Sequence, residues 1–227
     1  LKHSSLARLR ERSGPVVPHG AISSMAGTVA PDYKFKLMLV GEVNAGKTSL
    51  LTRLAEDRFK EGGFVDPCTW GIDFRICTRQ VDGARCKLQV WDSTGVDRFR
   101  HIQANTFRNA AGLAVVYDAT DRASFDRVGF WVEGVRRHAP PEAGWLLLGN
   151  KCDLEAARAV PNDEGEALAQ RLGMAFIETS AKTGQGVEAA VEALTRDALR
   201  RAPAPEPGAP AVVLGGGPAL ANGACCR

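Results

Sequence analysis

The 227-residue sequence contains no apolar run approaching the roughly 20 residues needed to cross a bilayer, and no N-terminal charged segment followed by a long apolar one. We therefore expect neither a transmembrane nor a secreted protein. Its charged residues are spread along the chain rather than gathered in blocks, so the net charge of +3 indicates no nucleic-acid-binding face. A nucleic acid partner is not expected.

The six cysteines form neither a metal-ligand pattern nor a disulfide framework. Four are scattered, and we expect them to be reduced cytosolic thiols: Cys68, Cys77, Cys86 and Cys152. The other two, Cys225 and Cys226, stand together beside the C-terminus.

An apolar share of 44% with 24% charged residues is typical of one soluble domain with a real core, flanked by tails. We expect an N-terminal extension at 1–32 that is disordered, a folded domain at 33–201, and a flexible Pro-, Gly- and Ala-rich tail at 202–227. Met25 is the expected natural start, with residues 1–24 as a translated leader or extension; a weak transit peptide is the alternative.

Strand-like apolar runs alternate with amphipathic stretches between residues 33 and 201. The runs are FKLMLVG, IDFRICTRQ, CKLQVWD, GLAVVYD, WLLLGN and MAFIET. Helices are expected from Lys47, from about Ser124 to Arg137, and at the end of the domain, where one stripe holds Val187, Ala190, Val191, Leu194 and Ala198. This alternation predicts an α/β fold with a mostly parallel sheet covered on both faces. Asp82-Gly83 predicts a tight hairpin and so one antiparallel pair.

A glycine loop at residues 41–48, GEVNAGKT, follows the first run and precedes a helix, which fits the phosphate-loop pattern G-x-x-x-x-G-K-[ST]. Its backbone N–H groups and the helix N-terminus would hold phosphate oxygens. Lys47 would reach the β and γ phosphates, and Thr48 would bind Mg²⁺. The alternative is a glycine turn with a purely structural use.

Asp92 ends the strand KLQVWD and is followed by Ser93, Thr94 and Gly95. Ligands of open α/β sheets bind outside the carboxyl ends of the strands, so a carboxylate there can support Mg²⁺. The N–H of Gly95 can approach the γ phosphate.

Two further segments at expected strand ends predict a guanine site. In NKCD, residues 150–153, Asp153 can accept two N–H bonds from the guanine edge while Lys151 lays its stem along the base. In TSAK, residues 179–182, Ala181 can offer a backbone N–H to the base oxygen. A site built for such hydrogen bonds rejects an analogue that lacks them by roughly 10⁴ to 10⁵.

With these motifs in order, the chain from about residue 33 to 200 resembles a small GTPase of the Ras superfamily, most of all the Rab family. The Rab-like segments are WGIDF (70–74), KLQVWD (87–92), DRFR (97–100), FR (107–108), VVYDAT (115–120) and the Cys225-Cys226 pair. The resemblance implies the P-loop NTPase G domain, with a six-stranded sheet that has one antiparallel edge strand. It also implies that Thr69 is the switch I threonine, which binds Mg²⁺ and the γ phosphate, and that switch II runs from Asp92 to about Arg108. A role in vesicle traffic is implied as well.

The expected cofactors are GTP or GDP and Mg²⁺. The expected nucleotide contacts are Val43, Asn44, Ala45, Gly46, Lys47, Thr48, Ser49, Phe64, Thr69, Gly95, Asn150, Lys151, Asp153, Ser180, Ala181 and Lys182. The expected Mg²⁺ ligands are Thr48, Thr69 and Asp92, and the residues around the reacting phosphate are Lys47, Thr69, Gly95 and Val96.

The resemblance also implies partners: an exchange factor, a GTPase-activating protein, a GDP dissociation inhibitor or escort protein, and effectors. Trp91 shares the more polar face of its strand with Lys87 and Gln89, which suits a docking site, although packing under switch II is an equal alternative. Prenyl groups on Cys225 and Cys226 would anchor the chain to the cytoplasmic face of a membrane, alongside a cytosolic pool.

Four departures from the family pattern concern hydrolysis. Val96 stands where the water-orienting glutamine is usual, and Thr94 where alanine is usual. Val43 adds branched bulk in the phosphate loop, and switch I, at 64–69, is two residues short and lacks its tyrosine.

Three interpretations remain open: a switch enzyme cycling between GTP and GDP with weak intrinsic hydrolysis, a GTP-loaded scaffold that hardly hydrolyses, and a relaxed duplicate. The intact binding residues argue against the last.

Overall fold

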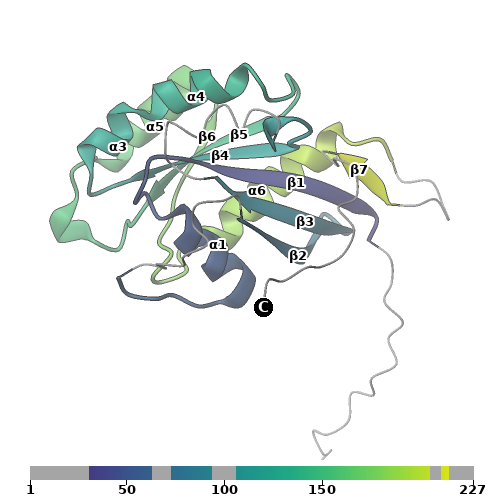
Figure 1. Ribbon diagram of the computed structural model, residues 1–227, viewed down its shortest axis with the longest axis horizontal. Coiled ribbons are helices and arrows are strands. Elements are labelled where there is room, and N and C mark those ends of the chain that lie inside the picture. The colour runs from purple at the N-terminus through teal and green to yellow at the C-terminus, as the bar shows by residue number, and fades with distance from the viewer. Residues whose placement is uncertain (1–30, 63–72, 94–105, 205–210, 215–227) are drawn as a thin grey trace, which may run out of the picture.

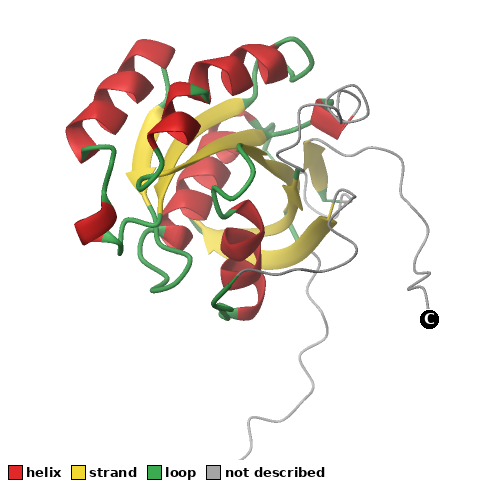
Figure 2. Ribbon diagram, turned by 60° about the vertical axis from the view of Figure 1, so that its left-hand side comes forward, coloured by secondary structure: helices red, strands yellow, loops and turns green. Residues whose placement is uncertain are grey.

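The computed structural model describes residues 31–62, 73–93, 106–204 and 211–214. In this part of the chain a single sheet lies between two layers of helices, which Figures 1 and 2 show from two sides. The predicted α/β class is confirmed.

The helices and strands follow the predicted alternation. The strands are β1 (Tyr33–Gly41), β2 (Asp73–Val81), β3 (Ala84–Asp92), β4 (Gly112–Asp118), β5 (Gly144–Asn150), β6 (Ala175–Glu178) and β7 (Val212–Leu214). The α-helices are α1 (Lys47–Glu56), α3 (Arg122–Asp126), α4 (Val128–Arg136), α5 (Asn162–Leu172) and α6 (Val187–Arg201), and a 3₁₀ turn, η2, spans Glu155–Ala157.

The main path of the sheet has the order β2-β3-β1-β4-β5-β6. β2 pairs antiparallel with β3, and the other pairs along this path are parallel. Asp82 and Gly83 join β2 to β3 with φ angles of 48° and 82°, the positive values that a two-residue hairpin turn of this kind requires. The predicted hairpin and the mostly parallel sheet with one antiparallel edge strand are confirmed, but β7, which pairs with β1, makes the sheet seven-stranded instead of six-stranded.

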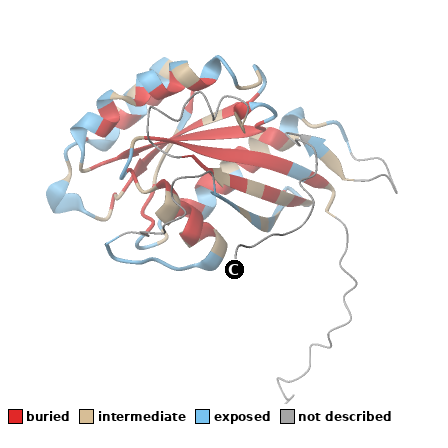
Figure 3. Ribbon diagram, in the orientation of Figure 1, coloured by how far each residue is buried: buried red, intermediate tan, exposed pale blue. Residues whose placement is uncertain are grey.

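Each face of the sheet carries its own apolar cluster. The central strands between the two clusters are largely buried, as Figure 3 shows. On one face, α1 and α6 pack against the sheet, and the predicted stripe of α6 is buried throughout. On the other face, α3, α4 and α5 cover β1, β4 and β5. β4 and β5 are buried almost throughout because helices cover both of their faces, whereas β2 at the edge is mostly exposed or half-buried.

The parallel arrangement brings the carboxyl ends of β1, β3, β4, β5 and β6 to one edge of the sheet. The predicted phosphate loop, Asp92 and the segments at 150–153 and 179–182 all follow these strand ends. The fold therefore places the candidate residues along one edge.

Three features differ from the sequence-based expectation. The helix expected from Ser124 to Arg137 is two helices, α3 and α4, with Arg127 between them, and α5 was not anticipated. The tail expected to be flexible from 202 contains β7, which pairs in parallel with the start of β1 and contributes the backbone bond from Val212 N–H to the Asp32 carbonyl. β4 pairs with β1 only from Leu37 onward, so the first residues of β1 accept β7 on that side.

Candidate functional site

The phosphate loop joins β1 to α1, and its shape depends on a glycine. Gly46 has a φ of 89°, and a Cβ there would lie 2.3 Å from Nδ2 of Asn150, so any other residue would be strained and would displace that side chain. α1 begins at Lys47, so its free N–H groups and the positive end of its dipole face the loop.

Lys47 points its ammonium back into the loop. It is 6% exposed, and Nζ donates to the carbonyls of Gly41 at 2.9 Å and Glu42 at 2.6 Å. Burial lowers the pKa of Lys47 to about 8, although the charges of Asp92 and Glu42 oppose the shift. A buried cation beside a helix N-terminus can attract the oxygens of a phosphate chain.

Thr48 and Asp92 meet across the site, where the Thr48 hydroxyl donates to Oδ2 of Asp92 at 2.5 Å. Asp92 is 8% exposed, and its Oδ1 is buried without a hydrogen-bond partner among the described residues. Burial raises the pKa of Asp92, while the Thr48 hydrogen bond and the Lys47 charge oppose that shift.

The Thr48 hydroxyl and the Asp92 carboxylate, whose Oδ1 is buried and unpaired among the described residues, are the hard oxygen donors that Mg²⁺ prefers, so these two residues fit the ion. The described part of the chain holds no cluster of three or more His, Cys, Asp or Glu side chains that could hold a metal alone. A cation here would need further oxygen ligands, as phosphates and waters supply.

Asn150 ties three segments of the site together. It is 1% exposed; its Nδ2 donates to the Ala45 carbonyl at 2.8 Å, and its Oδ1 accepts from Oγ1 of Thr179 and the N–H of Ala181, both at 3.3 Å. The N–H of Ala181, expected to face a base oxygen, is thus directed to Asn150 here. Asn150 therefore holds the phosphate loop and the 179–182 segment in a fixed position relative to each other.

Lys151 and Asp153 follow Asn150 in the chain, and the side chain of each is oriented by a neighbouring residue. The Lys151 ammonium lies 2.6 Å from Oδ2 of Asp118, and Lys151 has a positive φ of 65°. The Ser180 hydroxyl donates to Oδ1 of Asp153 at 2.6 Å. Both side chains are therefore oriented by contacts within the protein.

Two partners of site residues were missed by sequence reasoning. Asp118, which also accepts from Thr120, could have been found because an acid at the end of β4 falls on the same edge as Asp92. Glu42 accepts from Arg127 and, at 2.9 Å, from Nε1 of Trp131, which fastens the phosphate loop to α4. No spacing signal marks Glu42, because it occupies a variable position of the loop pattern.

Some of the remaining predicted residues lie in the described part of the chain, and the others do not. In the described part, Val43 is 48% exposed, Asn44 has a φ of 65° and Ser49 is half-buried in the first turn of α1. Lys182 forms an ion pair with Glu61 at 3.2 Å. The others lie outside the described residues, and their roles stay predictions: Phe64, Thr69, Thr94, Gly95, Val96, Cys225 and Cys226.

Beside the phosphate edge, β2 and β3 present an aromatic surface. Trp91 stacks on Phe74 with ring centroids 4.7 Å apart, and the Lys36 ammonium lies 4.6 Å from the Trp91 centroid. Phe74 is 39% and Ile76 51% exposed, whereas Trp91 is half-buried. Trp91 shares the half-buried face of β3 with Lys87 and Gln89, as predicted. The alternative, that it packs under switch II, is not tested, because residues 94–105 are outside the described residues.

No helix in the described ranges is long and apolar enough to cross a membrane.

Comparison with known proteins agrees with this geometry. The pattern of the Ras family matches residues 36–200. The chain is 44% identical over 170 residues to the human Ras-related protein Rab-8B, covering 75% of this chain and 81% of that protein. It is 45% identical to the GTP-binding protein ypt2 of Schizosaccharomyces pombe, over 75% of this chain and 84% of the relative. It is 43% identical to the Ras-related protein RABE1e of Arabidopsis thaliana, over 75% and 77%.

Proposed function

Because the chain belongs to the Ras family, and within it to the Rab small GTPases, we propose that it binds GTP and GDP with Mg²⁺ at the carboxyl edge of its sheet and acts as a membrane-anchored switch in vesicle traffic. The observation that carries the proposal is the convergence of the phosphate loop with the 150–153 and 179–182 segments, held together by the buried Asn150.

The phosphate end of the nucleotide would lie over the start of α1. The N–H groups of residues 43–49 and the Lys47 ammonium would bind its oxygens. Thr48 and Asp92 would hold Mg²⁺, with Thr69 as the third proposed protein ligand. Mg²⁺ held by these residues would supply positive charge that offsets the negative charge developing on the phosphates during transfer.

The base would lie against the other end of the edge. The Asp153 carboxylate, oriented by Ser180, would accept the two N–H groups that guanine presents and adenine does not. Lys151, held by Asp118, would cover the base with its stem, and the loop at 180–182 would close the side of the pocket. This arrangement favours guanine nucleotides over adenine nucleotides.

Hydrolysis of GTP is the activity of the family, and we propose that it is weak in this chain. A valine at position 96 would offer no hydrogen bond to the attacking water, and a threonine at position 94 would add bulk where the family has alanine. Val43 is 48% exposed on the loop, where an activator's arginine would have to enter. The same observation favours the second candidate function, a GTP-loaded module that recruits partners without turning over.

The partner surface we propose for effectors is the aromatic face of β2 and β3, made of Phe74, Ile76 and Trp91 with Lys36 beside them. Exposed aromatic side chains are enriched at protein interfaces. The strands of this surface, β2 and β3, adjoin, in sequence, residues 63–72 and 94–105, the proposed switches, so we propose that nucleotide state controls access to the surface. Exchange factors, activating proteins and a dissociation inhibitor or escort protein are the further partners we propose.

Membrane attachment would depend on prenyl groups at Cys225 and Cys226. The tail from Ala202 carries only Glu206 and Arg227 as charged residues, so no polybasic segment assists. One lipid chain binds marginally and two anchor stably. Replacing both cysteines by serine should release the protein from cell membranes; a double variant that stays on membranes would contradict this anchor.

The nucleotide proposal is tested by releasing the ligand from purified protein and identifying it by mass, then titrating GDP, GTP and ATP. We expect bound guanine nucleotide, a large preference for GDP and GTP over ATP, and faster dissociation when EDTA removes Mg²⁺. Equal affinity for ATP and GTP would overturn the proposal.

A further inference from the structure

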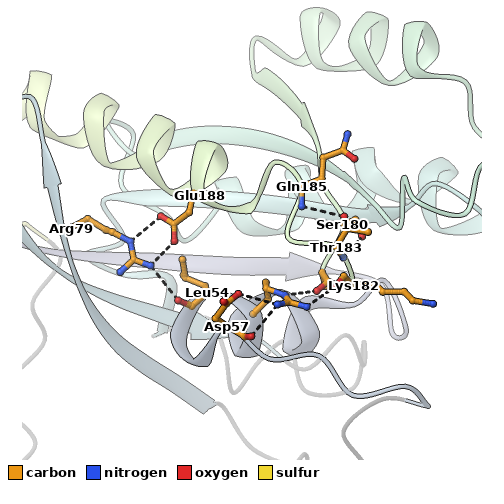
Figure 4. Close-up of polar contacts among 10 residues, drawn as sticks. Leu54, Asp57, Arg79, Ser180, Lys182, Thr183, Gln185 and Glu188 are labelled. Carbon is orange, nitrogen blue, oxygen red and sulfur yellow. Dashed lines mark hydrogen bonds and ion pairs between the residues drawn. The ribbon is translucent and has the colours of Figure 1, made fainter. Parts of the chain in front are cut away.

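Arg53, on α1, reaches across to the loop that follows β6. Its Nε donates to the Ala181 carbonyl at 2.8 Å and its Nη2 to the Lys182 carbonyl at 2.6 Å. Its Nη1 donates to the backbone carbonyl of Asp57 at 3.0 Å and to Oδ1 of Asp57 at 2.9 Å. Figure 4 shows Asp57, at the end of α1, and Lys182 on either side of this contact.

The Arg53 guanidinium binds backbone carbonyls of the 180–183 loop in addition to forming an ion pair with Asp57 at the surface. The Arg53 side chain is 16% exposed, while its ion-pair partner Asp57 is 93% exposed, so the pair itself contributes little. The two loop carbonyls have the greater weight, because a partly buried charged donor strengthens a hydrogen bond. Only a planar fork with several donors meets both carbonyls and Asp57 at once.

The contact continues from the loop to the predicted guanine-reading carboxylate. The peptide whose carbonyl Arg53 holds, between Lys182 and Thr183, directs its N–H to Oγ of Ser180 at 3.0 Å. That hydroxyl in turn donates to Oδ1 of Asp153 at 2.6 Å. Ser180 is 0% exposed, so water does not substitute for these bonds.

The same residue belongs to the helix that carries the phosphate end of the site. Thr48 and Arg53 both lie on α1, so the helix that begins at the phosphate loop also fastens the loop beside the base. No other side chain of α1 donates to residues 180–183 among the hydrogen bonds of the described residues.

We propose that Arg53 is a positioning residue that sets guanine selectivity, by holding the 180–183 loop and through it the Asp153 carboxylate. This inference rests on the proposed guanine-nucleotide function. Arg53 does not touch the ligand; it acts through Ser180. When it is lost, Asp153 keeps its charge but loses its fixed direction.

Arg79 provides a matched control in the same region. It donates to the Leu54 carbonyl of α1 at 3.2 Å and forms a forked pair with Glu188 of α6 at 2.9 and 2.6 Å, as Figure 4 shows. Its side chain is 28% exposed, and none of its hydrogen bonds goes to residues 180–183. Arg79→Ala should cost a comparable amount of stability without reaching Asp153.

The experiment compares GDP with IDP, because inosine lacks the 2-amino group that a correctly directed Asp153 would accept. Dissociation of each Mg²⁺-nucleotide complex is measured for the unmodified protein and for Arg53→Ala, Arg53→Lys, Ser180→Ala and Arg79→Ala. We expect Arg53→Ala to release GDP about tenfold faster, the equivalent of one charge-assisted hydrogen bond. The preference for GDP over IDP should fall by about threefold.

If Arg53 acts through Ser180 on Asp153, two further results are expected. Arg53→Lys, which keeps the charge but not the fork, should lose much of the preference, and it replaces Arg53→Ala if that variant does not fold. Arg53→Ala and Ser180→Ala combined should shift the preference no further than either alone, because both act on one path.

The possible results separate the two proposals. If Arg53 variants release GDP and IDP faster by the same factor, or if Arg79→Ala lowers the preference equally, Arg53 is only a structural tie and the inference is wrong. If the unmodified protein binds neither GDP nor IDP, the proposed function itself fails.

Discussion

The base end and the phosphate end of the candidate site are built differently. At the base end, Asn150, Lys151 and Asp153 each have a protein partner that fixes their direction. At the phosphate end, Oδ1 of Asp92 is buried without a partner among the described residues, and Val43 projects from the loop, 48% exposed. The recognising side chains of the base end are oriented by contacts within the protein, whereas at the phosphate end one oxygen of Asp92 is left for a cation to bind.

The same contrast separates binding from hydrolysis in the sequence. The residues expected to recognise guanine and phosphate keep the family pattern, and the departures, Val43, Thr94 and Val96, stand at positions that we expect to face the γ phosphate. Phosphoryl transfer depends on positioning and charge stabilisation, so a chain can bind well and still turn over slowly. Three substitutions test the base end, the junction of the two ends and the phosphate end, from the largest expected effect to the smallest.

The base end is broken most strongly by Asp153→Asn. The substituted oxygen becomes an N–H donor facing a guanine donor, so GTP affinity should fall by roughly 10⁴. Xanthosine nucleotides, which present a carbonyl at that place, should bind better than GTP. Equilibrium titration of both nucleotides measures the change. Asp163→Asn, at an exposed position of α5, is the control and should bind GTP as the unmodified protein does.

The junction of the two ends is tested by Gly46→Ala. A Cβ there would lie 2.3 Å from Nδ2 of Asn150, so we expect GDP affinity to fall about a hundredfold as Asn150 is displaced. Gly83→Ala is the control, because Gly83 has a similar φ of 82° but no atom within 4 Å of the added Cβ. It should lose about 1 kcal/mol of stability and keep GDP affinity. Equal affinities in the two variants would show that Asn150 does not join the two ends.

The anchoring of the phosphate loop is tested by Glu42→Gln, where the expected effect is smallest. The Glu42 carboxylate accepts from Arg127 and Trp131, and loss of its charge should weaken GDP binding about fivefold to tenfold. Glu133→Gln removes an exposed pair with Arg137 on the same helix and should change binding little. Isothermal titration of GDP compares them, and an equal effect of both substitutions would remove the anchoring role of Glu42.

Much of the fold followed from local pattern. The strands were predictable because helices on both faces make β4 and β5 continuously apolar, and the β2–β3 turn was predictable because Asp82-Gly83 favours positive φ angles. The break between α3 and α4 was not, since nothing in the stretch from 124 to 137 interrupts the helical period. β7 was missed because three residues in a Pro- and Gly-rich tail form a strand only where β1 has a free side.

The candidate site was predictable where a motif names the residue and unpredictable where a distant partner orients it. Asp153 follows from its motif, but its orientation by Ser180 depends on a contact between strand ends. Arg53 lies 128 residues from Ala181 in sequence, and no spacing rule relates them. Such contacts arise from tertiary packing, which local propensity does not encode.

The central claim, tight guanine-nucleotide binding with slow turnover, is tested most directly by single-turnover GTP hydrolysis of the Mg²⁺-loaded protein beside its Val96→Gln, Val43→Ser double variant. We expect the unmodified protein to bind GTP as tightly as the double variant but to hydrolyse it at least about tenfold more slowly, because the attacking water would lack an orienting partner. The difference should persist when a GTPase-activating protein is added. Equal hydrolysis rates in the two proteins, both alone and with the activator, would contradict it.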